Sequence, residues 1–176
     1  MRPGGYTLWE LVTVIAVAAV LAALAMPDFA KLRARAGVTT GADKLLGTLH
    51  FARSRAILGG VPTVVCLSSD GEHCVGRGVA AARSWIVFEN RRAEFTPVRD
   101  PGETILRRHQ IEGPTHLRAT RSTVTYWPTA RAGMTSTFEF CSRVGGVPPR
   151  AVIVSQTGRP RLRIGPARGS ATPCGN

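Results

Sequence analysis

A long apolar segment near the N-terminus constrains this chain more than any other feature. Residues 11–26 carry no charge, and Thr13 is their only polar residue. These 16 residues fall short of the ~20 that span a bilayer as a helix. Extending the segment back to Tyr6 gives a spanning length but encloses the carboxylate of Glu10. Since a carboxylate inside a membrane segment is costly without a partner, the sequence predicts a specific role for Glu10.

Two interpretations of this segment need no special role for Glu10. In a cleaved secretory signal, residues 23–25, with small Ala23 and Ala25, would form the cleavage site. The stretch before the apolar core is short for such a signal, and Gly5, Tyr6 and Glu10 have no function in it. In a plain N-terminal anchor, Glu10 would lie near the cytoplasmic edge of the membrane.

A third interpretation accounts for these residues. Gly5, Tyr6, Thr7, Leu8 and Glu10 resemble the prepilin signal of type IV pilins and type II secretion pseudopilins. The resemblance implies that prepilin peptidase cuts after Gly5 and that the new N-terminal residue, Tyr6, is N-methylated. It also implies that Glu10 pairs with the terminal amine of a neighbouring subunit during filament assembly. A buried carboxylate needs such a partner.

The resemblance divides the chain into three parts. Residues 1–5 are the leader, residues 6–58 form a stem helix that spans the membrane over about residues 8–26, and residues 59–176 form a globular domain. The expected location is the inner membrane, in a single pass with the C-terminal domain in the periplasm, followed by the surface pilus after assembly. Pro27 stands where the family places a helix-bending proline.

The stem is predicted to continue after Pro27 as an amphipathic helix. Apolar residues recur there at spacings of three and four, which marks one helix face: Val38, Ala42, Leu45, Leu49, Ala52 and Ala56. The pair Gly59 and Gly60 ends the helix. At 1.5 Å per residue the helix would be ~78 Å long, so its first half must project from the domain. Three glycines are expected to soften it: Gly37, Gly41 and Gly47.

The remaining residues predict a β-rich domain. Apolar and β-branched runs bounded by turn residues place strands at residues 61–67, 84–89, 104–109, 115–119, 124–127, 137–141, 151–155 and 161–164. Residues 76–82 are predicted to be a loop, and Asp70-Gly71 a hairpin turn. The unbroken apolar run 85–88 is typical of a strand buried on both faces.

Four cysteines allow three disulfide pairings, and a periplasmic or surface location permits disulfides. We expect Cys66–Cys74, which closes a short hairpin, and Cys141–Cys174, which ties down the C-terminus. A zinc site is the alternative, but the spacing of Cys66 and Cys74 is too long for a zinc knuckle. No metal or cofactor is therefore expected.

The charge is strongly basic, with 23 Lys and Arg against 11 Asp and Glu, for a net charge of +12. Such a balance favours an anionic partner, and general surface solubility is the alternative. The charge is uneven, because nine Arg and a single acid, Glu139, follow residue 112.

One basic stretch near the C-terminus stands out. If residues 158–163, Gly-Arg-Pro-Arg-Leu-Arg, are extended, Arg159, Arg161 and Arg163 share one face at ~6.6 Å intervals. Because Pro160 fits only an edge strand or a strand start, this row would lie on an exposed edge. It could follow a phosphodiester backbone by charge, or it could protect the edge against aggregation. Arg150 is a further candidate for the same surface.

Several later stretches narrow the resemblance. Residues 49–57, 64–71, 85–88 and 152–161 resemble the FimT/GspH group of minor pilins and pseudopilins, in the same order. The group implies an α+β fold of the pilin type, a long N-terminal helix packed on antiparallel β-sheets. The motif Gly158-Arg159-x-Arg161 resembles that of DNA-binding FimT pilins, which act in DNA uptake during natural transformation.

The sequence therefore predicts a type IV minor pilin that assembles through its stem and binds double-stranded DNA without sequence preference. Its other partners would be further pilins, prepilin peptidase and the inner membrane. The alternative is a GspH-like pseudopilin of type II secretion, or an assembly-priming minor pilin, without DNA binding. An enzyme is disfavoured because the four histidines have no catalytic or metal-binding spacing: His50, His73, His109 and His116.

Overall fold

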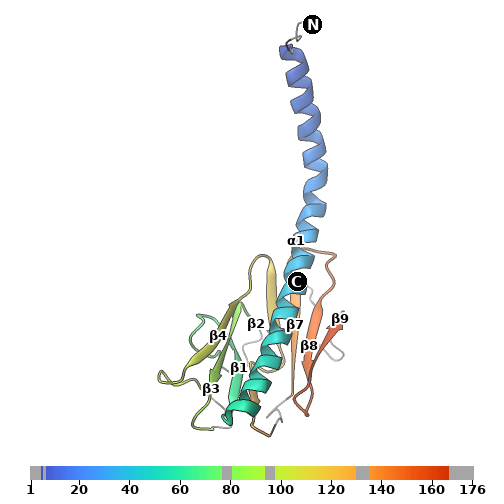
Figure 1. Ribbon diagram of the computed structural model, residues 1–176. Coiled ribbons are helices and arrows are strands. Elements are labelled where there is room, and N and C mark those ends of the chain that lie inside the picture. The colour runs from blue at the N-terminus through green and yellow to red at the C-terminus, as the bar shows by residue number, and fades with distance from the viewer. Residues whose placement is uncertain (1–4, 6, 77–80, 94–97, 130–134, 167–176) are drawn as a thin grey trace.

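A long helix organises the molecule, and half of it projects from the β domain (Figure 1). The computed structural model describes residues 5, 7–76, 81–93, 98–129 and 135–166. Helix α1 (Leu8–Gly59) starts after an N-cap at Thr7 and ends at Gly60, whose φ of 65° is the left-handed conformation that favours glycine. Both ends agree with the predicted helix to within about a residue.

The first half of α1 is exposed and the second half is buried on one face. The apolar side chains described between Leu8 and Leu32 are exposed, and burial begins at Ala34. Every member of the predicted apolar stripe, from Val38 to Ala56, is buried. The domain core therefore uses only the second half of the helix, as the periodicity predicts.

Within the described residues, no single straight helix has the length and apolar character that crossing a membrane requires. Leu8–Leu24 and Asp28–Gly59 satisfy that requirement together, with a bend of 42° between them. Pro27 lies within the bend, where the sequence predicts one.

The described residues form nine strands in two antiparallel sheets, which lie beside α1 (Figure 1). The first sheet has the order β4-β3-β1-β6 and the second the order β2-β5-β7-β8-β9. The strands are β1 (Thr63–Ser68), β2 (Ala81–Ala82), β3 (Ser84–Glu89), β4 (Ile105–Gln110), β5 (Thr115–Ala119), β6 (Thr123–Tyr126), β7 (Ser136–Ser142), β8 (Arg150–Val154) and β9 (Pro160–Ile164). The predicted α+β arrangement, a long N-terminal helix packed on antiparallel β-sheets, is confirmed.

The main core lies between α1 and the inner faces of both sheets. Its largest side chains from the strands are Trp85, Tyr126, Phe138 and Phe140, and they pack with the helix stripe. A second cluster covers the outer face of the first sheet and includes Ile86 and Phe88. Strand β3 is therefore buried on both faces, as its apolar run predicts. The prediction of a loop at residues 76–82 is wrong at Ala81–Ala82, which pair with β5.

Candidate nucleic-acid interface

A tight turn joins β8 to β9 and fixes the position of the first arginine of the motif. The Ser155 N–H donates to the Arg159 carbonyl at 3.3 Å, and the Gly158 N–H donates to the Ser155 carbonyl at 2.9 Å. Gly158 has a φ of 75°, which costs energy for a residue with a side chain. The glycine of the motif therefore serves the turn, and Arg159 follows directly from it.

The arginines of the motif lie along the free edge of the second sheet. Arg159 and Arg161 are exposed and Arg163 is half-buried, whereas Pro160 is buried and Leu162 packs against the core. Strand β9 is an outermost strand of its sheet, as the proline predicts. We call Arg159, Arg161 and Arg163 the arginine edge.

None of the salt bridges among the described residues involves the arginine edge. An exposed guanidinium presents up to five N–H donors in a planar fork that fits phosphate oxygens. The two exposed arginines are about 6.6 Å apart along an extended strand. The arrangement is a short row of free cations that suits a polyanion.

Arg150 lies on the other face of the second sheet. Its cross-strand neighbours are Phe140 and Ile164, and Phe140 belongs to the core between the sheets and α1. Arg161 lies opposite Ile153. Since side chains alternate between faces along a strand, the arginine edge lies on the face of the sheet that Arg150 does not share. The sequence analysis predicted that Arg150 belongs to the same surface as the arginine edge. The strand register places them on opposite faces of the sheet.

The turn before the arginine edge lies at the end of the second sheet remote from the projecting part of α1. Gly37, near the point where α1 leaves the domain, lies against Thr115 at the start of β5. Thr115 pairs with Ser142 at the end of β7, whereas Val154, just before the turn, pairs with Ser136 at its start. Figure 1 shows the β8–β9 hairpin turning at the end of the domain away from the projecting helix.

Aromatic side chains contribute little to this surface. Tyr126 is fully buried in the core, where burial raises the pKa of its hydroxyl. Trp127 is half-buried and follows β6, which belongs to the other sheet. Contact of the arginine edge with a polyanion would therefore depend on charge rather than on base stacking.

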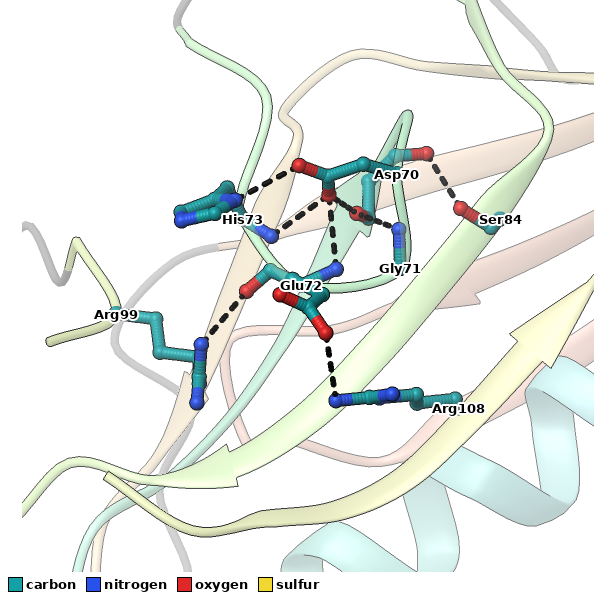
Figure 2. Close-up of polar contacts among 8 residues, drawn as sticks. Asp70, Gly71, Glu72, His73, Ser84, Arg99 and Arg108 are labelled. Atoms are coloured by element: carbon teal, nitrogen blue, oxygen red, sulfur yellow. Dashed lines mark hydrogen bonds and ion pairs between the residues drawn. The ribbon is translucent and has the colours of Figure 1, made fainter. Parts of the chain in front are cut away.

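A disulfide-closed loop braces the outer face of the first sheet, and Figure 2 shows the polar contacts of this loop. Cys66 and Cys74 are joined with an S–S distance of 2.06 Å, which confirms the first predicted disulfide. Between them, the Asp70 carboxylate accepts hydrogen bonds from the N–H groups of Glu72 and His73, both at 2.8 Å, and from the Ser68 hydroxyl at 3.0 Å. These contacts make residues 68–74 a structural turn.

The same loop is tied to neighbouring segments. The Glu72 carbonyl accepts from Arg99 Nη1 at 3.1 Å, and its carboxylate pairs with Arg108 of β4 at 3.3 Å (Figure 2). Cys141, the first member of the other predicted disulfide, is also disulfide-bonded. Its predicted partner, Cys174, lies outside the described residues.

At the start of the stem, Glu10 makes a contact that the sequence interpretation did not include. Its Oε2 accepts from the Thr7 N–H at 2.8 Å and from the Thr7 hydroxyl at 2.9 Å. The Thr7 hydroxyl in turn accepts from the Glu10 N–H at 3.4 Å. This capping box was recognisable in the spacing of Thr7 and Glu10. Gly5 is exposed, and Tyr6 lies outside the described residues.

In the described part of the chain, no three His, Cys, Asp or Glu side chains gather in a way that could hold a metal ion. His73 bonds Asp70 through Nδ1 at 2.7 Å. Burial lowers the pKa of both His109 and His116, and in each case two nearby cations lower it further.

Comparison with known proteins identifies a matching family and solved structures with a similar fold. A family model described as type II transport protein GspH matches residues 41–158. The type IV minor pilin FimU of Pseudomonas aeruginosa is 17% identical with a TM-score of 0.54, and the match covers 80% of this chain and 96% of FimU. The minor pseudopilin EpsH of the Vibrio cholerae type 2 secretion system is 13% identical with a TM-score of 0.50, covering 76% and 98%. These identities show a shared fold alone. No curated protein matches the sequence.

Proposed function

Because the chain belongs to the GspH family of type II transport proteins, we propose that it is a minor pilin that assembles through α1 and binds DNA through its arginine edge. The DNA would be double-stranded and recognised by its phosphates. The biological role would be DNA uptake in natural transformation. The resemblance of Gly158, Arg159 and Arg161 to the FimT motif supports this assignment within the family.

The stem supports the assembly part of the proposal. Large apolar side chains from Leu8 to Leu32 are exposed in the isolated chain, and such a surface needs lipid or other helices to cover it. Before assembly the stem would lie in the inner membrane with the domain in the periplasm. Cleavage after Gly5 by prepilin peptidase and methylation of Tyr6 would then precede packing against other pilins. Glu10 would pair with the terminal amine of a neighbour.

The observation that carries the DNA part is the exposure of Arg159 and Arg161 beside the hairpin turn. Edge protection alone would require charges on β9 but no particular turn. The left-handed conformation of Gly158 fixes the position of Arg159 directly after the turn. The arginine edge therefore has a defined geometry. The turn also lies away from the stem, where a filament would leave it accessible.

A second candidate is a pseudopilin of type II secretion, or an assembly-priming minor pilin, without DNA affinity. The description of the matching family, type II transport protein GspH, favours it. This candidate requires the same stem and fold and assigns the arginine edge to protection of β9. DNA affinity therefore separates the two candidates.

The test is a gel-shift titration of the full chain in non-ionic detergent micelles with duplex DNA. The variant Arg159→Ala/Arg161→Ala is compared with the wild type at low and at physiological salt. Arg150→Ala is the matched control, because it removes an arginine from the same sheet but on the opposite face. We expect salt-sensitive binding that the double substitution abolishes and the control retains.

Folding of each variant is checked by thermal unfolding. If the folded wild type does not shift DNA at low salt, the pseudopilin candidate replaces the minor pilin with DNA affinity. If the double variant shifts DNA as well as the wild type does, the arginine edge is not the binding site.

A further inference from the structure

The arginine edge lies on one side of α1. A second group of basic side chains lies on the opposite side, where the helix passes β3 and β4. The Trp85 Nε1–H of β3 donates to Thr48 Oγ1 at 3.3 Å. Further along, Arg55 of α1 pairs with Glu89 at the end of β3, at 2.8 Å. These two contacts show that α1 and β3 run in the same direction over this stretch.

Strand β4 runs antiparallel to β3 and brings two side chains to the helix. Arg107 lies opposite Val87 and His109 opposite Trp85, and both partners belong to the inner core. The Arg107 guanidinium carbon lies 3.7 Å from the centroid of the Phe51 ring of α1. The His109 ring lies 5.2 Å from Trp85, at a tilt of 30°. Both basic side chains are thus held against aromatic rings.

Lys44 completes the group from the helix. Lys44, Thr48 and Phe51 follow the spacing i, i+4, i+7, which places them on one helix flank. Since Thr48 touches Trp85 and Phe51 touches Arg107, this spacing places Lys44 near His109. The pKa of His109 is lowered first by burial and then by the charges of Lys44 and Arg107, which agrees with this placement. We call Lys44, Arg107 and His109 the cationic seam.

No acid among the described residues forms a salt bridge with the cationic seam. Glu89, the acid nearest along β3, is already shared by Arg55 and Arg91. Lys44 and Arg107 are exposed, and an arginine stacked on an aromatic ring keeps its N–H edge free for phosphate.

We propose that the cationic seam is a second phosphate-binding site for DNA, separate from the arginine edge. Strands β4 and β9, which carry the two sites, lie on opposite sides of α1 (Figure 1). Duplex DNA is stiff, with a persistence length of about 150 base pairs, so one segment does not wrap around the domain to reach both. Each chain therefore holds two duplex segments. This inference rests on the proposed DNA binding.

The experiment measures how many short duplexes bind to one chain. The full chain in non-ionic micelles is titrated calorimetrically at low salt with a duplex of about one helical turn, ~10 base pairs. We expect the wild type to bind two duplexes per chain. Lys44→Gln/Arg107→Gln and Arg159→Gln/Arg161→Gln should each bind one, because each loses a different site.

The variants separate this inference from the proposed function. If Lys44→Gln/Arg107→Gln still binds two duplexes, the second site is wrong, whatever the other variant does. If Arg159→Gln/Arg161→Gln still binds two duplexes while Lys44→Gln/Arg107→Gln binds one, the arginine edge is not a DNA-binding site. The cationic seam is then retained as one. A wild type that binds a single duplex also overturns the second site.

A second measurement guards against a misfolded seam variant. In the wild type, the imidazole of His109 is followed by NMR as pH is varied, with and without the duplex. A phosphate seated between Lys44 and Arg107 favours the charged imidazole, so the pKa of His109 should rise when DNA binds. The substitution Lys44→Gln should reduce that rise without touching Trp85 or Phe51. An unchanged His109 pKa in wild type with DNA bound would overturn the proposal.

Discussion

Arg55 of α1 donates from Nε and Nη2 to a single carboxylate oxygen of Glu89, at 3.1 and 2.8 Å. Arg91 occupies the other oxygen of Glu89 at 3.1 Å. The Glu89 side chain is only 6% exposed, so its charge depends on these partners rather than on water. This ion pair fastens the last turns of the stem helix to the end of β3.

We expect Glu89→Gln to lower the free energy of unfolding by about 1–3 kcal/mol, because hydrogen bonds to a buried charge are lost. The matched control is Glu72→Gln, which breaks the pair with Arg108, where both side chains are about half exposed. An exposed pair contributes up to about 1 kcal/mol. Denaturant unfolding of both variants checks the comparison, and equal losses would contradict the role given to Glu89.

The glycines of α1 offer a second comparison. A Cβ built at Gly41 would lie 2.8 Å from the Phe140 ring, whereas nothing lies within 4 Å of one built at Gly47. Alanine is favoured over glycine in a helix by about 1 kcal/mol. We therefore expect Gly47→Ala to raise the melting temperature. Gly41→Ala should lower it, because overpacking costs about 1–3 kcal/mol. Thermal unfolding measures both variants. If Gly41→Ala raised the melting temperature as Gly47→Ala does, Phe140 would be shown to move aside freely.

The Asp70 turn should make stability depend on acid pH. The N–H groups of His73 and Glu72, together with the His73 ring and the Ser68 hydroxyl, hold the pKa of the Asp70 carboxyl well below its ordinary value. The unfolded chain therefore binds this proton first, near pH 4. The contribution of Asp70 is complete above that pH and is lost as the pH falls further.

We therefore expect the melting temperature of the wild type to fall more steeply below pH 4 than that of Asp70→Asn. Asp28→Asn is the control, since Asp28 lies on the exposed stem with one contact to Lys31 at 3.9 Å. This control should keep the steepness of the wild type. Parallel curves for wild type and Asp70→Asn would contradict the role of Asp70.

Local signals predicted the elements well. The apolar run between Arg83 and Asn90 gave β3 its observed bounds, and the double glycine after Leu58 ended the helix at the expected place. Pro160 predicted an edge strand because its ring nitrogen cannot donate to a ladder. In each case the information lies within a few residues of the element, where propensity and turn chemistry act.

Pairings between distant segments were not predictable in the same way. Strand β1 pairs with β6, some sixty positions along the chain, and no local pattern selects that partner. Arg150 was grouped with the arginine edge by its nearness in sequence, but its face is set by the register between β8 and β9. The cationic seam was missed for the same reason, because Lys44 and Arg107 both come near His109 only once α1 packs beside β4.

The three helix glycines illustrate a further limit. From the sequence, the same role was expected for Gly37, Gly41 and Gly47, namely that each makes the helix more flexible. In the structure, Gly37 lies against Thr115 and Gly41 against Phe140, while Gly47 is open. Two of them permit close approach of helix and sheet, a role that depends on what lies opposite and not on helix propensity.

The most direct test of the DNA-binding account is the salt dependence of duplex affinity, measured by fluorescence anisotropy on the full chain in non-ionic micelles. The slope of log K against log salt changes by about 0.9 for each phosphate contact. We predict that Arg159→Ala/Arg161→Ala reduces the slope by about 1.8 and that Arg150→Ala leaves it unchanged. Equal slopes for wild type and double variant would contradict the arginine edge as the site of phosphate contact.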